Sequence, residues 1–199
     1  MLIGGYIKNF KGFGIEIETR LQTPINQTDI IIRDVINRTF IIEKGTVDRL
    51  SHMSRREREN IKTLKFYTNG TYSFDDIILY FQKLPFLKYL VICDIDNTFI
   101  CLIPKRIFTN TKEDFNERLI ANYLTHPNRH IPRDIPDAIT SRVNENEKII
   151  NILIKMRKDN LNVIVVVSNI DIFEGIVEAK DLEKLIVDIT LTANGLIAL

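Results

Sequence analysis

One stretch of the chain occurs twice, and this duplication limits the fold more than any other feature of the sequence. Residues 91–103 (VICDIDNTFICLI) align without a gap on residues 165–177 (VVVSNIDIFEGIV), 74 positions later. Each copy has an apolar run, a polar turn rich in Asp, Asn or Ser, and a second apolar run, which is the pattern of a β-hairpin. The turns are expected at residues 94–98 and 168–171. The duplication therefore predicts two similar structural units.

The segments that flank the two hairpins also correspond. Before each hairpin, apolar residues recur at the spacing of an amphipathic helix, and an extended segment precedes that helix. After each hairpin, a second helix is expected. These elements fall at residues 63–67, 74–81 and from Pro104 in the first copy, and at residues 139–143, 147–156 and from Glu178 in the second. The predicted unit is β-α-β-β-α, present twice and related by a pseudo-twofold axis.

The composition is that of an ordinary globular protein. Of 199 residues, 45% are hydrophobic and 27% are charged, which excludes disordered and low-complexity classes. The formal net charge of +1 lacks the basic excess of proteins that neutralise nucleic-acid phosphates. No apolar run has the length of a membrane span, and the N-terminus lacks the apolar region of a signal peptide. We therefore expect a cytoplasmic protein with neither nucleic acid nor membrane as a partner.

The cysteines and histidines show no pattern of a metal centre or of nucleophilic catalysis. Cys93 and Cys101 lie inside apolar runs, without the spacing of a CxxC or Cys/His site. We expect two buried, reduced thiols, no bound metal and no resident cofactor.

The first 60 residues differ from the repeats. Short apolar runs at residues 14–18, 30–32 and 39–43 predict strands. Ser54 and Glu57 have the spacing of a helix capping box, and the RRERE segment that follows Ser54 is typical of a solvated helix face. We expect an α/β (α+β) chain with a small β-rich N-terminal region at 1–60, a first repeat at 61–125 and a second repeat at 126–199.

The second copy carries the motif that points to a known family. In the phrase FEGIVEAKDL, a Gly and a hydrophobic residue are followed at a fixed distance by an Asp: Gly175, Ile176 and Asp181. This order resembles the cystathionine-β-synthase (CBS) domain, two of which in tandem form a Bateman module. Glu178 stands where that family has Ser or Thr. The corresponding run of the first copy, residues 101–107, lacks the Gly, the Ser or Thr, and the Asp.

The resemblance implies a regulatory or sensor module that binds an adenosyl ligand, such as AMP, ATP or S-adenosylmethionine, in a cleft between the repeats. It implies that Asp181 accepts hydrogen bonds from ribose hydroxyls and that the extended segment with Thr140 and Val143 lines the adenine. The negative charge of Glu178 would repel a phosphate unless nearby cations neutralise it. The candidates for that role are Lys180 and, from the other copy, Lys105 and Arg106. The resemblance also implies a homodimer and no catalytic activity.

Two other functions remain open at this stage. The segment Asp94-Ile95-Asp96-Asn97-Thr98 after an apolar strand is similar to the first motif of haloacid-dehalogenase-type phosphatases. In those enzymes the first Asp attacks phosphorus and the second acts as acid and base beside Mg²⁺. Because this segment and Ser168-Asn169 occupy equivalent positions in the repeat, hairpin turns are the favoured interpretation. In the third function, the repeats bind no ligand and only hold the chain together as a dimer.

Overall fold

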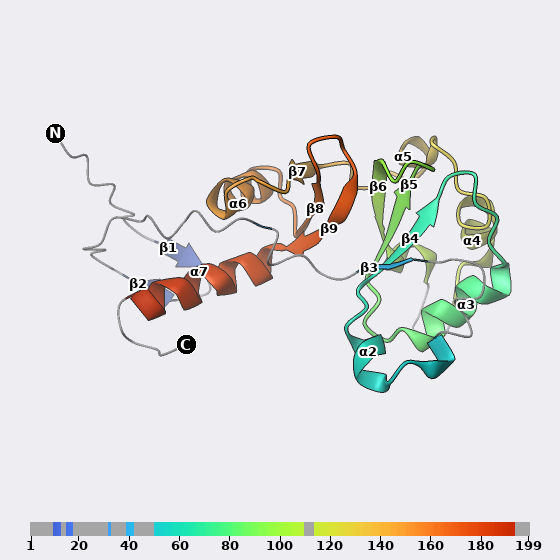
Figure 1. The fold of residues 1–199 in the computed structure, drawn as a ribbon, viewed down its shortest axis with the longest axis horizontal. Helices are drawn as coiled ribbons and strands as arrows, with labels where there is room; N and C mark the ends of the chain where they lie inside the picture. Colours follow the sequence, from blue (N-terminus) through green and yellow to red (C-terminus); the bar gives the residue numbers. More distant parts are fainter. Residues whose placement is uncertain are drawn as a thin grey trace.

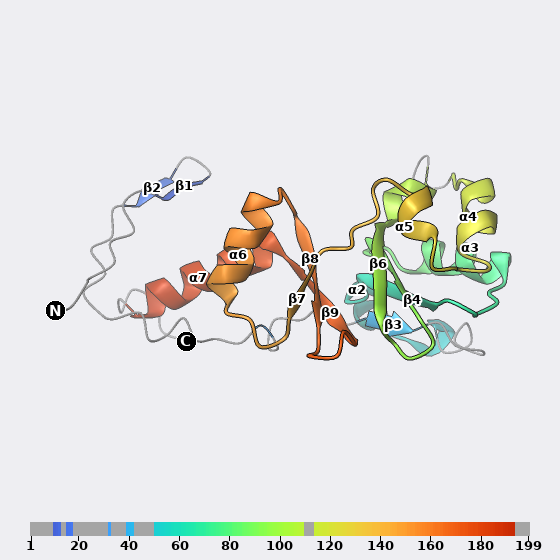
Figure 2. The same ribbon diagram turned by 90° about the horizontal axis from the view of Figure 1, so that it is seen from above.

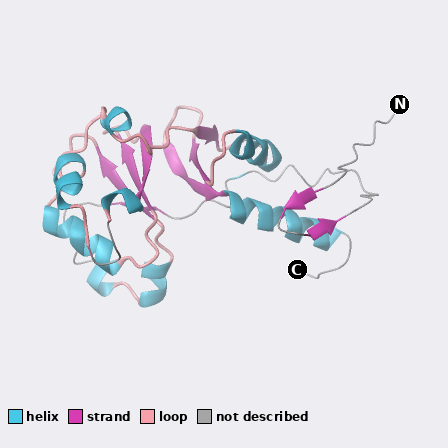
Figure 3. Ribbon diagram, turned by 180° about the vertical axis from the view of Figure 1, so that it is seen from behind, coloured by secondary structure: helices cyan, strands magenta, loops and turns pink. Residues whose placement is uncertain are grey.

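The computed structural model describes residues 10–12, 15–17, 32, 39–41, 50–109 and 114–193. The two repeats each form a small sheet, and the two sheets lie side by side with helices on their outer faces (Figure 1). Figure 2 shows the same layering from above, and Figure 3 shows the strands of both repeats in the middle of the molecule. The surface between the two sheets is therefore where the repeats meet.

The first repeat has its strand, helix and hairpin where the sequence predicts them. They are β4 (Thr63–Tyr67), α3 (Phe74–Lys83), β5 (Tyr89–Cys93) and β6 (Phe99–Pro104). Strand β4 is parallel to β5, and β5 is antiparallel to β6. The helix begins after Ser73, whose side chain accepts a hydrogen bond from the backbone N–H of Asp76, as a good N-cap residue does.

The second repeat has the same order and the same pairing. Its elements are β7 (Arg142–Asn144), α6 (Ile149–Lys158), β8 (Val163–Val167), β9 (Phe173–Glu178) and α7 (Ala179–Ala193). Strand β7 is parallel to β8, and β8 is antiparallel to β9. Each hairpin has a register shift at the same place, between residues 92 and 93 in the first copy and between residues 166 and 167 in the second. The predicted duplication is confirmed.

The helix predicted from Pro104 at the end of the first repeat is short. It begins in the expected place but forms only a four-residue 3-10 helix, η3 (Lys105–Phe108), without a side-chain cap. Lys105 and Arg106 place positive charge at the positive end of this helix, whereas α7 has Asp181 in its first turn. The chain continues through α4 (Glu117–Tyr123) and α5 (Ile131–Asp134), which connect the two repeats.

Equivalent side chains fix the two hairpin turns. Oδ1 of Asp94 accepts hydrogen bonds from the backbone amides two and four residues later, at 3.0 and 2.9 Å. Oγ of Ser168, 74 positions further along, accepts from its own two corresponding amides at 3.4 and 3.3 Å. The left-handed residues of the turns correspond as well, since Asn97 has φ 64° and Asp171 has φ 61°. Both turns therefore use the local hydrogen bonding that Asp and Ser provide.

A basic residue on the neighbouring strand holds each left-handed residue. Nζ of Lys65 donates to Oδ1 of Asn97 at 2.8 Å. In the second repeat, Arg142 makes a bidentate contact to Asp171 at 2.7 and 3.0 Å. Lys65 is only 5% exposed, and its Nζ lies 4.6 Å from the centre of the Phe173 ring. Burial lowers the pKa of Lys65, and the amide and the ring stabilise its ammonium group inside the protein.

The two hairpins meet through reciprocal backbone hydrogen bonds. The N–H of Phe99 donates to the carbonyl of Asp171, and the N–H of Phe173 donates to the carbonyl of Asn97, both at 3.1 Å. The rings of Phe99 and Phe173 stack with their centres 6.4 Å apart. Each contact maps onto its counterpart when the copies are exchanged. The two hairpins are thus related by an approximate twofold axis, as predicted.

The hydrophobic core between the sheets contains equivalent residues from both copies. Its buried pairs are Val91 and Val165, Cys93 and Val167, Phe99 and Phe173, and Leu102 and Ile176. The alternate residues of the same strands face outward, to the helices: Leu90 and Ile92 lie in the core of the first repeat. Because both faces of these strands are buried, their sequences are continuous apolar runs rather than alternating ones.

Parts of the N-terminal region contribute to both repeats. Strands β1 (Phe10–Gly12) and β2 (Ile15–Ile17) pair with each other, and β3 (Thr39–Ile41) pairs in parallel with β4. The predicted strands at residues 14–18 and 39–43 are confirmed in their described parts. Of the strand predicted at residues 30–32, only Ile32 is described, and it lies in a 3-10 turn rather than a strand. Leu50 is buried in the core of the first repeat, and Ile32 in that of the second.

The capping box is confirmed at the start of α2 (Arg55–Glu59). The side chain of Ser54 accepts a hydrogen bond from the N–H of Glu57 at 3.3 Å, and the carboxylate of Glu57 accepts from the N–H of Ser54 at 2.7 Å. None of the five residues of this helix is buried, as expected for a solvated face.

The contact between the hairpins should dominate stability. Phe173 is 4% exposed, so the substitution Phe173→Ala should cost about 3–5 kcal/mol of unfolding free energy. The matched control Ile170→Ala lies in the same hairpin at 76% exposure and should change stability by less than about 0.5 kcal/mol. Urea unfolding measures both. Equal effects of the two substitutions would contradict the inter-repeat core.

Candidate functional site

Glu178, the last residue of β9, is the centre of an ionic cluster between the repeats. Its side chain is 5% exposed, and its Oε1 accepts a hydrogen bond from Nζ of Lys88 at 2.7 Å. Its Oε2 lies 3.3 Å from Nζ of Lys180 and 3.7 Å from Nζ of Lys62. Lys62 and Lys88 belong to the first repeat, whereas Glu178 and Lys180 belong to the second. The cluster thus joins the two repeats electrostatically.

Asp181 adds a second carboxylate to this cluster. It lies in the first turn of α7, its side chain is 32% exposed, and its Oδ2 is 3.6 Å from Nζ of Lys62. The N-terminal turn of a helix favours a negative charge because the helix dipole is positive there. Unlike Glu178, Asp181 is open enough to contact a molecule from solvent. Lys62 lies between the two carboxylates and contacts both.

The pKa shifts reflect the balance between burial and ion pairing. Burial by itself would raise the pKa of Glu178, but the hydrogen bond from Lys88 and the ionic contacts with Lys88 and Lys180 outweigh it and lower the pKa. The contact with Glu178 raises the pKa of Lys180. Burial, and then the charge of Glu178, raise the pKa of Tyr89 to about 12. At neutral pH the cluster therefore contains a charged Lys180, a charged Glu178 and a neutral phenol.

Two buried oxygen atoms at this end of the interface have unused hydrogen-bonding capacity. Oε2 of Glu178 has ion-pair neighbours but no hydrogen-bond partner among the described residues. Oγ1 of Thr63 likewise has none there, although the residue is 0% exposed. Thr63 follows Lys62 in the chain and lies opposite Tyr89 in the β4–β5 register. Buried polar atoms normally find partners, so this region has capacity for further hydrogen bonds.

The structure brings together three of the residues chosen from the sequence, and places the others elsewhere. Glu178, Lys180 and Asp181 form the cluster, and Arg106 lies close enough to Tyr89 for its charge to lower the pKa of that phenol. Arg106 itself pairs with Asp137 at 3.6 Å, on the exposed surface.

The remaining three residues lie outside the cluster. Nζ of Lys105 donates to the carbonyl of Phe81 at 2.9 Å and lies over the Phe81 ring, where burial lowers its pKa. The neutralisation of Glu178 expected from Lys105 comes instead from Lys62 and Lys88. Val143 is 8% exposed and packs in the core of the second repeat, whereas Thr140 is exposed.

The first copy does not repeat the cluster. The positions 74 residues before Glu178 and Asp181 are occupied by Pro104 and Ile107, and the position 74 residues after Lys88 is Asn162. None of these side chains is charged. The two ends of the pseudo-twofold interface have therefore diverged, and only the end at Glu178 carries this constellation.

The geometry of Asp94 agrees with a structural turn. Oδ1 is engaged by two backbone amides of its own turn, and Oδ2 accepts a hydrogen bond from Arg129 at 3.0 Å. The segment connects the antiparallel strands β5 and β6, and its backbone contacts correspond to those of Ser168. These observations favour the interpretation of residues 94–98 as a hairpin turn over a phosphatase motif.

Comparisons with known proteins were made for the sequence and for the fold. No protein-family model matches the chain, and no curated protein matches it. Among solved structures, the CBS domain of a putative transporter from Clostridium difficile 630 is 16% identical, with 80% of this chain and 95% of that chain covered and a TM-score of 0.48. A CBS domain protein from Pyrobaculum aerophilum complexed with AMP is 16% identical, with 69% and 98% covered and a TM-score of 0.42.

A third structure, the CBS domains of a transcriptional regulator from Streptococcus pneumoniae, is 8% identical, with 78% and 98% covered and a TM-score of 0.44. Since these TM-scores are below 0.5, the fold assignment rests on the strand order, the registers and the reciprocal contacts. These define a module of two β-α-β-β-α repeats packed sheet to sheet. This is the architecture that the sequence predicts through its resemblance to a tandem CBS-domain pair.

Within the described ranges, no helix combines the length and apolar character needed to cross a membrane.

The ionic cluster should make stability depend on pH through Glu178. Because folding lowers its pKa, the contribution of Glu178 is fully present above its ordinary value of 4.5 and is lost as the pH falls through the lower, folded-state value. The substitution Glu178→Gln should cost about 2 kcal/mol at pH 7, less than a fully buried pair because the lysines are partly exposed. The substitution should also reduce the loss of unfolding free energy that occurs as the pH is lowered below 4.5.

Urea unfolding of the two proteins from pH 7 down to pH 3 measures this effect. The exposed substitution Glu174→Gln, in the same strand, serves as the matched control and should keep the wild-type pH profile. An unchanged loss of unfolding free energy at acid pH in Glu178→Gln would contradict the assignment of the cluster.

Proposed function

We propose that this chain is a regulatory module that binds an adenosyl ligand between its two repeats, at the cluster of Asp181, Glu178 and their lysines. The observation that carries the proposal is the partly exposed carboxylate of Asp181, beside the ammonium groups of Lys62 and Lys180, at an interface built from both repeats. No catalytic step is part of the proposal.

The chemistry of the cluster suits such a ligand. A carboxylate such as Asp181 accepts two hydroxyl protons in charge-assisted hydrogen bonds, which are stronger than neutral ones. The start of α7 and the lysines favour a negatively charged group close by, because both present positive charge. Solved CBS-domain structures include complexes with AMP and with 5′-methylthioadenosine and S-adenosyl-L-methionine, and these guide the choice of ligands for the test.

Regulation would follow from the position of Lys62. Lys62 of the first repeat contacts both carboxylates of the second. A ligand whose hydroxyls bind Asp181 competes with Lys62 for that carboxylate. Binding then changes an electrostatic contact between the repeats and favours one arrangement of them over another. A ligand that binds one arrangement of the repeats more tightly than the other shifts the population toward the arrangement that it binds more tightly.

We also propose that the module acts as a homodimer. Helices α6 and α7 pack on each other and expose Ile150, Ile154 and Val187, at 37%, 59% and 45%. Apolar side chains exposed along adjacent helices support association through this face. The cytoplasmic location expected from the sequence stays a prediction, as does the absence of nucleic-acid and membrane partners.

Ligand binding should raise thermal stability. A ligand that binds only the folded state at about 100 times its Kd adds roughly 2.7 kcal/mol, which raises Tm by about 5 to 10 °C in a protein of this size. We expect such a shift with at least one of AMP, ADP, ATP, adenosine and S-adenosylmethionine. Asp181→Asn should weaken that ligand by at least about tenfold, because it removes a charged acceptor.

The matched control is Lys184→Gln, an exposed substitution on the same helix, which should keep wild-type affinity. No shift with any of the five compounds would contradict the ligand-binding function and favour a purely structural dimerisation module. Mg²⁺-dependent hydrolysis of p-nitrophenyl phosphate that disappears in Asp94→Asn would instead favour the phosphatase.

The dimer is tested by sedimentation equilibrium. We expect a mass of two chains, and a mass of one chain for Ile154→Lys, because a charge buried at the interface is strongly unfavourable. Ile95→Lys is the control, since Ile95 lies in a hairpin turn at 70% exposure and should leave the dimer intact. A single-chain mass for the wild-type protein would overturn this part of the proposal.

A further inference from the structure

The connection between α3 and β5 differs from its duplicate. It comprises residues 84–88, whereas the equivalent connection between α6 and β8 comprises residues 159–162 and is one residue shorter. Leu87 is 5% exposed and packs in the first core, and Leu161, 74 positions later, packs against the second. Phe86 is 51% exposed. The connection in the first repeat thus has one residue more than its duplicate. It also exposes the ring of Phe86, which the fold of the repeat does not require.

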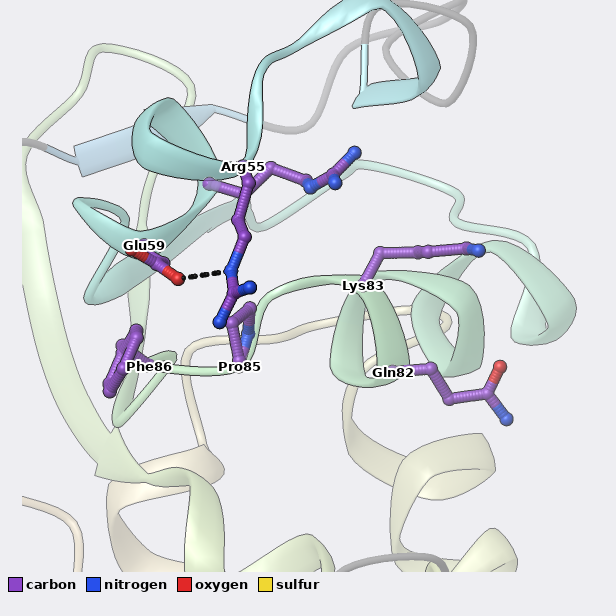
Figure 4. Close-up of a pocket in the computed structure, with 7 residues that line it drawn as sticks. Arg55, Glu59, Gln82, Lys83, Pro85 and Phe86 are labelled. Carbon is purple, nitrogen blue, oxygen red and sulfur yellow. Dashed lines mark hydrogen bonds and ion pairs between the residues drawn. The ribbon is translucent and has the colours of Figure 1, made fainter.

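Phe86 borders a hollow that lies between α2 and the end of α3. The hollow measures about 380 Å³ and is lined by α2, the last turn of α3 and the Pro85–Phe86 step (Figure 4). Helix α2 precedes the first repeat, and the short helix that precedes the second repeat, α5, packs its Ile131 in the core of the first repeat. This surface therefore belongs to the first repeat alone and is separate from the Asp181 cluster.

The lining combines positive charge with an apolar floor. Its charged residues are Arg55, Arg58 and Lys83, against the single carboxylate of Glu59. That carboxylate accepts a hydrogen bond from Nε of Arg55 at 2.7 Å, as the dashed line in Figure 4 marks. The hollow thus has a surplus of two positive charges, and it complements an acidic partner.

The exposure of the lining distinguishes between kinds of partner. The side chain of Arg55 is 88% exposed, and half of Phe86 is open to solvent. Small-molecule sites enclose most of their ligand, which so open a surface does not do. A peptide laid across the surface needs no enclosure. Protein interfaces also favour this composition, since aromatic and Arg residues supply much of their binding energy and charge complementarity supplies specificity.

We propose that this hollow is a docking surface for an acidic segment of a protein partner. One apolar side chain of that segment packs on Phe86 and Pro85, and flanking carboxylates contact Arg55, Arg58 and Lys83. The proposal does not depend on the ligand site between the repeats, because the surface uses none of the residues of that site.

Fluorescence anisotropy with the full chain tests the proposal. The probe is a fluorescein-labelled peptide of about ten Asp and Glu residues around one central Leu. Binding is expected with a Kd below about 1 mM that weakens as salt is added. Phe86→Ser and the double substitution Arg55→Gln/Lys83→Gln should each weaken binding by about tenfold or more. Both change exposed residues, and circular dichroism verifies the fold.

The matched control is Arg133→Gln, which should keep wild-type affinity because this exposed arginine belongs to α5, a helix that lies across the first repeat from α2 (Figure 1). A peptide with Ser in place of Leu should bind more weakly than the Leu peptide. No binding at low salt, or equal losses in Arg133→Gln and the hollow variants, would overturn the proposal. The proposal would also be overturned if the peptide does not bind but a single-stranded oligonucleotide or phosphatidylserine vesicles bind in a way that depends on Phe86. That result would assign another kind of partner to the surface.

Discussion

The two repeats form one structure because their hairpins bind to each other. Phe99 and Phe173 donate reciprocal backbone hydrogen bonds across the interface and stack their rings, and equivalent valines and other apolar residues fill the core beneath them. The sheets of the two repeats, of four and three strands, each have an apolar face that is unfavourable to expose to water. Burying that face against its duplicate solves the problem for both copies at once. Every other inter-repeat contact depends on this arrangement.

The ionic cluster is one such contact, and it illustrates how duplicated units diverge. The end of β9 carries Glu178, buried among lysines from both repeats, whereas the equivalent end of β6 carries Pro104. A buried carboxylate is tolerated only when cations and hydrogen bonds surround it. Lys62 and Lys88 meet that requirement, and Lys62 also lies beside Asp181. Asymmetry at the two ends of a symmetric interface thus gathers the carboxylates of Glu178 and Asp181 with their lysines at one end.

The sequence was sufficient to predict the fold because its signals were local and occurred twice. The gapless hairpin alignment, the turn residues at 94–98 and the capping box at Ser54 all depend on near neighbours. The cluster was only half predictable, since Glu178, Lys180 and Asp181 share a motif but Lys62 and Lys88 lie just before β4 and β5, far from that motif in the sequence. Lys105 was chosen because it follows β6, yet its long side chain turns back to Phe81. The spacing of residues in the sequence determines neither the direction in which a long side chain points nor which distant residues lie close together in the fold.

Native-state hydrogen exchange tests the central claim, that the hairpins pair with each other, most directly. The amides of Phe99 and Phe173 should exchange slowly and with similar protection, because both donate across the interface and open only when the repeats separate. The amide of the exposed turn residue Ile95 should exchange rapidly by comparison. Exchange of Phe99 and Phe173 as fast as that of Ile95, in an otherwise protected protein, would mean that the two repeats do not share this interface.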